Sequence, residues 1–254
     1  MNLFRYLVCT TIAVAGCAAD TTTPGDDGTS SAIIGGKKTA ADPAVMLLFA
    51  GNLSTGDGAI CTATLIAPRV LVTAAHCTST EEVGADAQFM VWSGTDFDGV
   101  GEPLEVSSVM HDNAFDVNAL QGGHDIGAVI LAAPSTITPM AVNTTIDPDT
   151  LVGKSVKIVG YGVNNGSKQT GAGVKRIATT TVRSVDDRLI YLGDRKHGTC
   201  QGDSGGPAIA TLSGVPTLIG VTSFGDVGCT DGGYDTRVDR YASFIASALS
   251  RGQR

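Results

Sequence analysis

The 254-residue sequence predicts an all-β fold, and three observations support this prediction. Short apolar or alternating runs recur along the chain, turn-favouring Gly, Pro, Asn and Asp residues separate them, and 43% of the residues are hydrophobic against 17% charged. Such runs are typical of short antiparallel strands, and such a composition is typical of a globular protein with a core. In chain order, the predicted strands are residues 45–50 (VMLLFA), 63–67 (ATLIA), 70–75 (VLVTAA), 88–92 (QFMVW), 126–131 (IGAVIL), 155–159 (SVKIV), 177–182 (IATTTV), 207–212 (PAIATL) and 217–223 (TLIGVTS).

The last segment departs from this pattern. Its apolar residues recur every three or four positions, which predicts a terminal helix that begins after Asp239, with Asp239 as a candidate cap. These residues are Tyr241, Phe244, Ile245, Ala248 and Leu249. We find no internal repeat and no second compositional boundary, so the folded part is one compact unit or two tightly packed halves.

The N-terminus predicts export. Arg5 supplies a positive charge, and residues 6–15 form an apolar run of the length of a signal-peptide core, too short to span a bilayer. Residues 14–17 (VAGC) resemble the lipobox of bacterial lipoproteins, in which the cysteine, here Cys17, carries the lipid. The alternative is an ordinary secretory signal cut near Ala15 or Ala19. We therefore assign residues 1–17 to a signal peptide and expect an extracellular protein, or a lipoprotein of the bacterial outer membrane or cell surface before processing.

Residues 18–32 have the composition of a disordered linker or propeptide, so we expect the folded domain to span residues 33–254. The net charge of −8 argues against a nucleic-acid partner, because a phosphate-binding surface needs a cluster of Lys and Arg. A lipid at Cys17 is the one membrane attachment that we expect.

Beyond the signal peptide, four cysteines remain: Cys61, Cys77, Cys200 and Cys229. An even number in an exported chain favours disulfides, and four cysteines allow three pairings. A zinc site is the rival, and the absence of a Cys-x-x-Cys pair or of clustered histidines in the sequence argues against it. We expect no metal and no cofactor.

Three separate stretches carry residues suited to nucleophilic catalysis. Ser204 lies in residues 199–207 (TCQGDSGGP), and a serine hydroxyl needs a base to remove its proton. His76 follows a predicted strand in residues 70–77 (VLVTAAHC), and Asp125 precedes another in residues 123–131 (GHDIGAVIL). A carboxylate of this kind can orient the imidazole and stabilise its cation.

The motifs TAAHC, HDIGAVIL and GDSGGP, in the order His, Asp, Ser, resemble those of the chymotrypsin family of serine proteases. The resemblance runs from Ile33 to the terminal helix. It implies two packed six-stranded antiparallel β-barrels with a C-terminal α-helix, the first barrel from Ile33 to about Ala141 and the second onward. It also implies a serine endopeptidase whose active site lies in the cleft between the barrels.

The same resemblance assigns roles to individual residues. Ser204 corresponds to the nucleophile, His76 to the general base and then acid, and Asp125 to the orienting carboxylate. The backbone N–H groups of Gly202 and Ser204 correspond to the oxyanion hole. Ser223 corresponds to the serine that supports the buried aspartate.

Two disulfides and an activation step are also implied. Cys61 would pair with Cys77 beside the histidine, and Cys200 with Cys229 beside the substrate pocket. In this family, a cut frees the amino group of the first domain residue, here Ile33, which pairs with the aspartate before the nucleophile, here Asp203. The residues before the cut are Ser31 and Ala32 instead of Arg or Lys, so we expect an activating protease that prefers small residues.

Specificity stays open at this level. Glycines at the pocket base and walls favour a slot for bulky apolar side chains, Asp235 could reach the floor and select basic ones, and small aliphatic side chains are a third alternative. The residues that correspond to the pocket are Gly198, Thr199, Ser223, Phe224, Gly225, Gly233 and Asp235.

The expected partners are protein or peptide substrates, the activating protease and protein inhibitors. The rival interpretation is a catalytically silent binding protein on the same scaffold, because a fold does not prove an activity.

Overall fold

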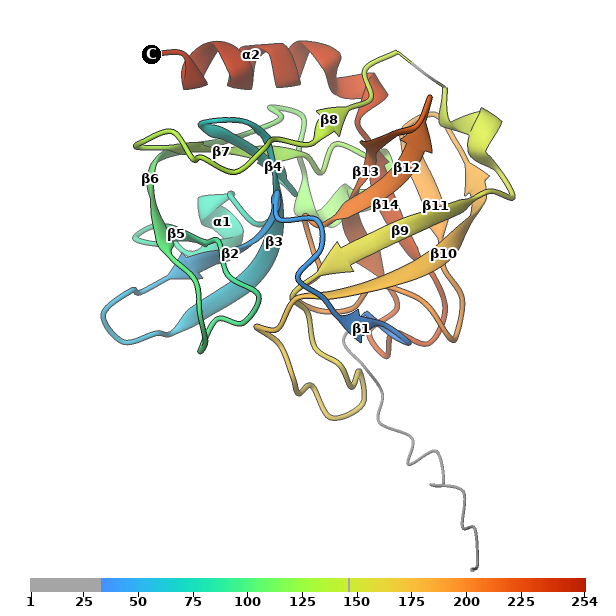
Figure 1. Ribbon diagram of the computed structural model, residues 1–254, viewed down its shortest axis with the longest axis horizontal. Helices are drawn as coiled ribbons and strands as arrows, with labels where there is room; N and C mark the ends of the chain where they lie inside the picture. The colour runs from blue at the N-terminus through green and yellow to red at the C-terminus, as the bar shows by residue number, and fades with distance from the viewer. Residues whose placement is uncertain (1–32, 146) are drawn as a thin grey trace, which may run out of the picture.

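The computed structural model describes residues 33–145 and 147–254, and Figure 1 shows two β-barrels side by side with a helix across the top of the first. The predicted signal peptide, Cys17 and the linker of residues 18–32 lie outside the described residues. Within the described ranges, no helix is both long and apolar enough to cross a membrane.

The first barrel is a closed ring of six antiparallel strands in the order β2-β3-β4-β7-β6-β5. Its strands are β2 (Val45–Gly51), β3 (Gly58–Ala67), β4 (Val70–Thr73), β5 (Gln88–Trp92), β6 (Pro103–His111) and β7 (Gly127–Leu131). Every residue of β2, β4 and β7 is buried, because these apolar strands face the barrel interior on one side and other parts of the protein on the other.

The second barrel also closes with six antiparallel strands, since β9 pairs with both β10 and β12. Its strands are β9 (Ser155–Gly160), β10 (Arg176–Val185), β11 (Leu189–Leu192), β12 (Pro207–Leu212), β13 (Val215–Gly225) and β14 (Gly233–Arg237). Two short strands extend this sheet: β1 (Lys37–Lys38) pairs with β10, and β8 (Ala141–Val142) runs parallel to β13. The expected fold class, two six-stranded barrels with a C-terminal helix, is confirmed.

The expected span of the first barrel, from Ile33 to about Ala141, is wrong at its start. The first described residues belong to the second barrel: Ile33 is fully buried in its apolar core, and Ile34 forms a β-bridge with Gly198. The other end agrees with expectation, because Ala141 pairs with β13 of the second barrel. The described chain therefore begins in the second barrel, continues through the strands of the first barrel and then returns to complete the second.

The nine predicted strands all coincide with observed ones, within a few residues at their ends. The strands that the pattern missed are β6, β11, β14 and the two-residue β1 and β8. β6 is largely half-buried or exposed, β11 has four residues, and β14 buries Asp, Thr and Arg side chains. β11 (LIYL) is a short continuous apolar run that the prediction missed, whereas β6 and β14 have no continuous apolar run.

The terminal helix α2 (Ala242–Gly252) follows a 3₁₀ turn at Asp239–Tyr241 and packs on β4 and β7 of the first barrel. Asp239 does not cap it, contrary to expectation, because its carboxylate accepts hydrogen bonds from the guanidinium of Arg237. The other helical segments are short: α1 (Thr80–Val83) and 3₁₀ turns at Val117–Gly122 and Pro148–Leu151.

Candidate active site

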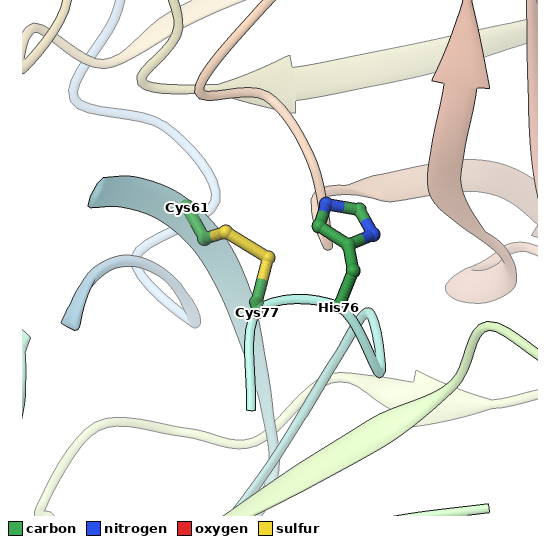
Figure 2. A group of neighbouring side chains, drawn as sticks. All are labelled: Cys61, His76 and Cys77. Atoms are coloured by element: carbon green, nitrogen blue, oxygen red, sulfur yellow. A yellow bond between two sulfur atoms is a disulfide. The ribbon is translucent and has the colours of Figure 1, made fainter. Parts of the chain in front are cut away.

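His76 lies in the loop that leaves β4, and a disulfide holds this loop in place. Cys77 is bonded to Cys61 of β3, with the two Cα atoms 6.3 Å apart, and Figure 2 shows the imidazole projecting beside this bond. The His76 side chain is 22% exposed, so one edge of its ring can reach a substrate. The pairing expected from the resemblance is confirmed.

Asp125 binds His76 through both carboxylate oxygens. The backbone N–H of His76 donates to Oδ1 at 2.9 Å, and Nδ1 of the ring lies 2.8 Å from Oδ2. The carboxylate is fully buried, and Asp125 lies two residues before β7. Because Nδ1 uses its hydrogen for Asp125, the Nε2 atom is left as the proton acceptor of the ring.

The second barrel supplies the remaining contacts to Asp125. Ser223 of β13 donates its hydroxyl to Oδ2 at 2.5 Å, and Thr236 of β14 donates to the backbone carbonyl of Asp125 at 2.9 Å. The carboxylate thus receives hydrogen bonds from both barrels, which fix its position at the interface between them.

Burial and charge act in opposite directions on the pKa of these two residues. Burial alone would lower the pKa of His76, but the hydrogen bond and negative charge of Asp125 outweigh it and raise this pKa above 6.5. Burial alone would raise the pKa of Asp125, but the hydrogen bonds and charge of His76, together with Ser223, bring it below 3.8. Asp125 therefore stays anionic, and His76 beside it can gain and lose a proton, as a general base must.

Ser204 reaches the histidine loop from the second barrel. Its carbonyl oxygen accepts a hydrogen bond from the backbone N–H of Thr62 at 2.8 Å and lies 3.8 Å from the sulfur of Cys77. The hydroxyl of Thr62 also donates to the carbonyl of Gly202 at 3.0 Å. One threonine of β3 thus holds the serine loop against the first barrel.

The loop backbone before Ser204 is shaped by glycine. Gly202 has a φ of +93°, and a Cβ at this position would lie 2.8 Å from the Cα of Gly162, so only glycine fits. The N–H groups of Gly202 and Ser204 have no acceptor in the part of the chain that the structure describes. These two donors are therefore available to an incoming oxygen, as the resemblance implies for an oxyanion hole.

Asp203 is fully buried and accepts hydrogen bonds from three backbone N–H groups. Gly162 donates to Oδ1 at 2.8 Å, Cys200 donates to Oδ2 at 2.9 Å, and the third donor is Ile33. Burial outweighs these bonds and raises the pKa of Asp203 to about 7. A Cβ at Gly162 would lie 2.7 Å from Cγ of Asp203, so this glycine, which the motifs did not single out, makes room for the carboxylate.

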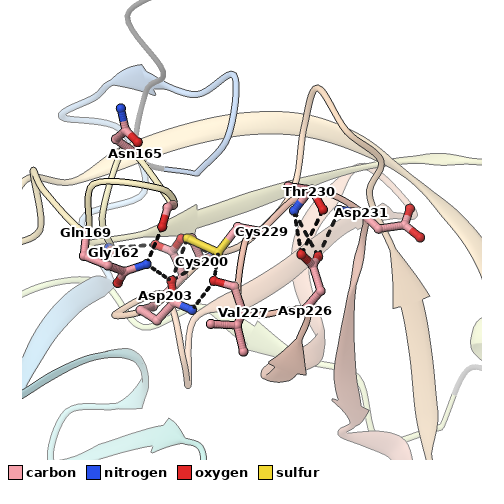
Figure 3. The surroundings of a disulfide bond; sticks show 12 residues. Gly162, Asn165, Gln169, Cys200, Asp203, Asp226, Val227, Cys229, Thr230 and Asp231 are labelled. Atoms are coloured by element: carbon pink, nitrogen blue, oxygen red, sulfur yellow. Dashed lines mark hydrogen bonds between the residues drawn. A yellow bond between two sulfur atoms is a disulfide. The ribbon is translucent and has the colours of Figure 1, made fainter.

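The second disulfide joins Cys200 to Cys229, with Cα atoms 5.4 Å apart, and Figure 3 shows it beside Asp203. Gln201 bridges the region, since its side-chain amide donates to the carbonyl of Val227 at 3.0 Å. The pairing implied by the resemblance is again confirmed.

A cavity of about 190 Å³ opens beside Ser204. Four of the expected pocket residues line it (Thr199, Ser223, Phe224 and Gly225), together with Cys200, Gln201, Ser204, Thr222, Asp226 and Cys229. Gly198, Gly233 and Asp235 were also expected in the pocket and do not line this cavity. Thr222 and Asp226 were missed, because nothing in the sequence next to Ser223 indicates which side chains turn inward.

The sulfur atoms of Cys61 and Cys77 lie near the ring of His76, a grouping that could suggest a metal site. The two sulfurs are bonded to each other, so they offer no thiolate to a metal. His76 alone is not a metal site.

Two closed antiparallel barrels, with an aspartate-bound histidine and a serine loop at their interface, define the class of serine proteases with the chymotrypsin-like fold. The family described as trypsin matches residues 33–245, and the chain belongs to this family.

Individual relatives agree with this assignment. The trypsin of Saccharopolyspora erythraea is 31% identical over 225 residues, which cover 80% of this chain and 93% of that protein. Chymotrypsin-like elastase family member 1 of Bos taurus is 26% identical over 214 residues, 75% of this chain and 79% of that protein. The structure of neuropsin, a serine protease expressed in the limbic system of mouse brain, has the same fold, with a TM-score of 0.68 at 20% identity, and covers 84% of this chain and 98% of that chain.

Proposed function

We propose that the chain is a secreted serine endopeptidase that hydrolyses peptide bonds through an acyl-enzyme, with His76, Asp125 and Ser204 as its catalytic residues. The observation that carries the proposal is the buried Asp125 carboxylate with both oxygens bonded to His76. Burial of a carboxylate destabilises the fold, but a buried carboxylate that orients a histidine promotes proton transfer.

In the proposed reaction, Nε2 of His76 removes the proton of the Ser204 hydroxyl while the serine oxygen attacks the substrate carbonyl. The resulting imidazolium is stabilised by Asp125, which stays ionised because its pKa is low. His76 then returns the proton to the departing amine, and water repeats the sequence to release the acid.

The negative oxygen of the intermediate would be bound by the N–H groups of Gly202 and Ser204. Loss of one such donor typically costs about 2.7 to 4 kcal/mol of transition-state stabilisation. The free N–H groups and the positive φ of Gly202 support this role.

We also propose that a cut before Ile33 activates the enzyme. In the intact chain, Ile33 has a φ of +47°, which is unfavourable for a β-branched residue, and offers Asp203 a neutral N–H donor. A cut removes the preceding carbonyl carbon, one of the four atoms that define this φ, and replaces the amide with an ammonium group. A positive charge at this site would lower the raised pKa of Asp203 and hold the loop of Gly202 in place.

A fluorophosphonate probe tests the proposal directly, because it reacts with an activated serine without any knowledge of the substrate. Chain beginning at Ile33 should label, and peptide mapping should find the label on Ser204. The variants Ser204→Ala and Asp125→Asn are the controls: the first should not label, and the second should label far more slowly. Folded, correctly cut protein without label would point to a catalytically silent binding protein instead.

The activation step needs a separate measurement. N-terminal sequencing of the active form from the culture medium should begin at Ile33, and full-length chain should label slowly in comparison. Active protein that begins elsewhere, or equal labelling of uncut chain, would overturn the activation step but leave the catalytic proposal standing. If Cys17 carries a lipid, the same cut releases the domain from the membrane.

A further inference from the structure

A cavity of about 700 Å³ opens between the terminal helix α2 and the end of β6. It shares no lining residue with the cavity beside Ser204, so the proposed catalytic reaction does not use it. Three arginines line it, Arg188, Arg240 and Arg251, against one carboxylate among the described lining residues, that of Asp112. We call it the arginine cavity. Its walls are positively charged, although the whole chain has a net charge of −8.

The helix α2, at the top of Figure 1, lines the arginine cavity with one face. Phe244, Ser247 and Arg251 follow one another at intervals of three and four positions, and residues at this spacing share a helical face. At about 1.5 Å per residue, Phe244 and Arg251 are roughly 10 Å apart along the helix. Arg240 precedes Phe244 in the 3₁₀ turn before the helix. Positive charge therefore lies at both ends of this wall, with an aromatic ring between them.

The guanidinium groups of the arginine cavity keep donors free for a ligand. Arg188 and Arg240 share the single carboxylate of Asp187, at N···O distances of 3.0 and 3.2 Å, and their side chains are 44% and 47% exposed. Arg240 also donates to the backbone carbonyl of Asp187. Arg251 forms no ion pair within residues 33–145 and 147–254. Because each guanidinium has five N–H donors, the three arginines can bind further anionic groups.

The other lining residues narrow the chemistry of the ligand. Asp112 does not compete for the arginines: its Oδ1 accepts the N–H of Ala114 and lies 3.2 Å from Nδ1 of His124. Met110 and Phe244 add half-buried apolar surface. A sulfated polysaccharide has no apolar side chain to place there, whereas a peptide can bury one and bind the arginines through carboxylates. The arginine cavity therefore suits an acidic peptide that contains an apolar residue.

We propose that the arginine cavity is a docking site for an acidic segment of a partner protein, in which Glu or Asp residues flank an apolar residue. The carboxylates of the segment would bind Arg188, Arg240 and Arg251, and its apolar side chain would pack on Phe244. An extended chain advances about 3.3 Å per residue, so about six residues span the cavity. Docking here holds a partner outside the cavity beside Ser204. The inference thus goes beyond the proposed peptidase activity and does not depend on it.

Fluorescence polarisation with a dye-labelled peptide, Glu-Glu-Leu-Phe-Glu-Glu, tests the inference. The full chain carries Ser204→Ala in this experiment, so that the peptide is not cut and the result does not depend on catalysis. The probe should bind, and its affinity should fall as salt is added, because salt screens exposed charges. Peptides with Gln in place of Glu, or with Ser in place of Leu and Phe, should each bind about 10-fold more weakly.

Removal of the three arginines should also weaken binding of the probe. We expect about a 10-fold loss of affinity, because each exposed ion pair contributes only a small amount, in the variant that combines Arg188→Gln, Arg240→Gln and Arg251→Gln. Arg251→Gln alone keeps the test decisive if the triple variant does not fold, since Arg251 has no ion-pair partner to lose among the described residues. It should weaken binding about 3-fold.

The matched control removes three exposed positive charges outside the cavity and should bind the probe as the parent does: Lys154→Gln, Lys168→Gln and Arg195→Gln. Absence of saturable binding at low ionic strength, or equal losses in the cavity variant and in this control, overturns the inference. Equal affinity for the Leu-Phe and Ser-Ser peptides, together with tighter binding of dextran sulfate, would assign the cavity to a polysaccharide and overturn it too.

Discussion

Removal of the Ser223 hydroxyl should weaken both the fold and the proton transfer. Ser223→Ala takes away one of three donors to the carboxylate of Asp125, and the other two come from His76. A hydrogen bond to a charged group contributes about 1.5 to 3 kcal/mol. Both partners are buried, so water does not replace the lost donor. At about 2 to 4 °C per kcal/mol for a domain of this size, the melting temperature should fall by about 3 to 12 °C.

The kinetic effect has a direction as well as a size. With fewer donors, the carboxylate of Asp125 attracts the proton of His76 more strongly, which raises the histidine pKa further above 6.5. The acid limb of the kcat/KM profile should therefore move to higher pH, with activity depressed near neutrality and largely recovered in alkali.

Thr236→Val is the matched control, because the Thr236 hydroxyl donates to the backbone carbonyl of Asp125 and not to its carboxylate. It should lower the free energy of unfolding by about 1 kcal/mol, which lowers the melting temperature by about 2 to 4 °C, and leave the acid limb in place. Calorimetry and pH profiles on one substrate give both readouts. Equal shifts of the acid limb in the two variants, or none in Ser223→Ala, would refute the reasoning.

Three further results are expected. The kcat/KM of the cut enzyme should rise through an apparent pKa above 6.5, because His76 must lose its proton to act as a base, and a limb below 6.5 contradicts its pairing. Burial raises the pKa of Asp203 to about 7 and that of Asp235 to about 8, both above the ordinary value of 3.8. Between about pH 4 and 8 the folded uncut chain therefore binds more protons than the unfolded chain, so its stability should fall as the pH rises. When Asp203 and Asp235 are both changed to Asn, the urea midpoint should fall less steeply with pH. An unchanged slope refutes this prediction. Purified uncut chain should not process itself before Ile33, because Ser31 and Ala32 point to a separate activating protease that prefers small residues; self-cleavage at this bond, seen by mass spectrometry, contradicts that expectation.

The sequence predicts those strands in which burial alone determines which type of residue stands at each position. β2 and β7 are buried along their whole length, so their sequences are continuous apolar runs. β14 lacks such a run because its buried residues include Asp235, Thr236 and Arg237. Thr236 donates to the carbonyl of Asp125, and Arg237 binds Asp147 and Asp239. A pattern of apolar residues cannot predict a strand built around polar contacts.

The candidate site divides in the same way. His76, Asp125 and Ser204 stand in local motifs, so their types and order could be recognised one stretch at a time. Thr62 and Gly162 could not, because their roles arise only when distant segments meet: the hydroxyl of Thr62 reaches Gly202 across 140 positions of sequence. The same holds for the entry of the chain through the second barrel, which depends on the burial of Ile33 and on no local pattern.

The double contact of Thr62 also limits how this protein can be rearranged. One residue of the first barrel holds the carbonyls of Ser204 and Gly202, which belong to the second. The two barrels are therefore not interchangeable modules, although each closes on its own. A chimera that takes one barrel from a relative must also match this threonine to the foreign serine loop. The contacts at the interface between the barrels therefore have to be kept together when either barrel is replaced.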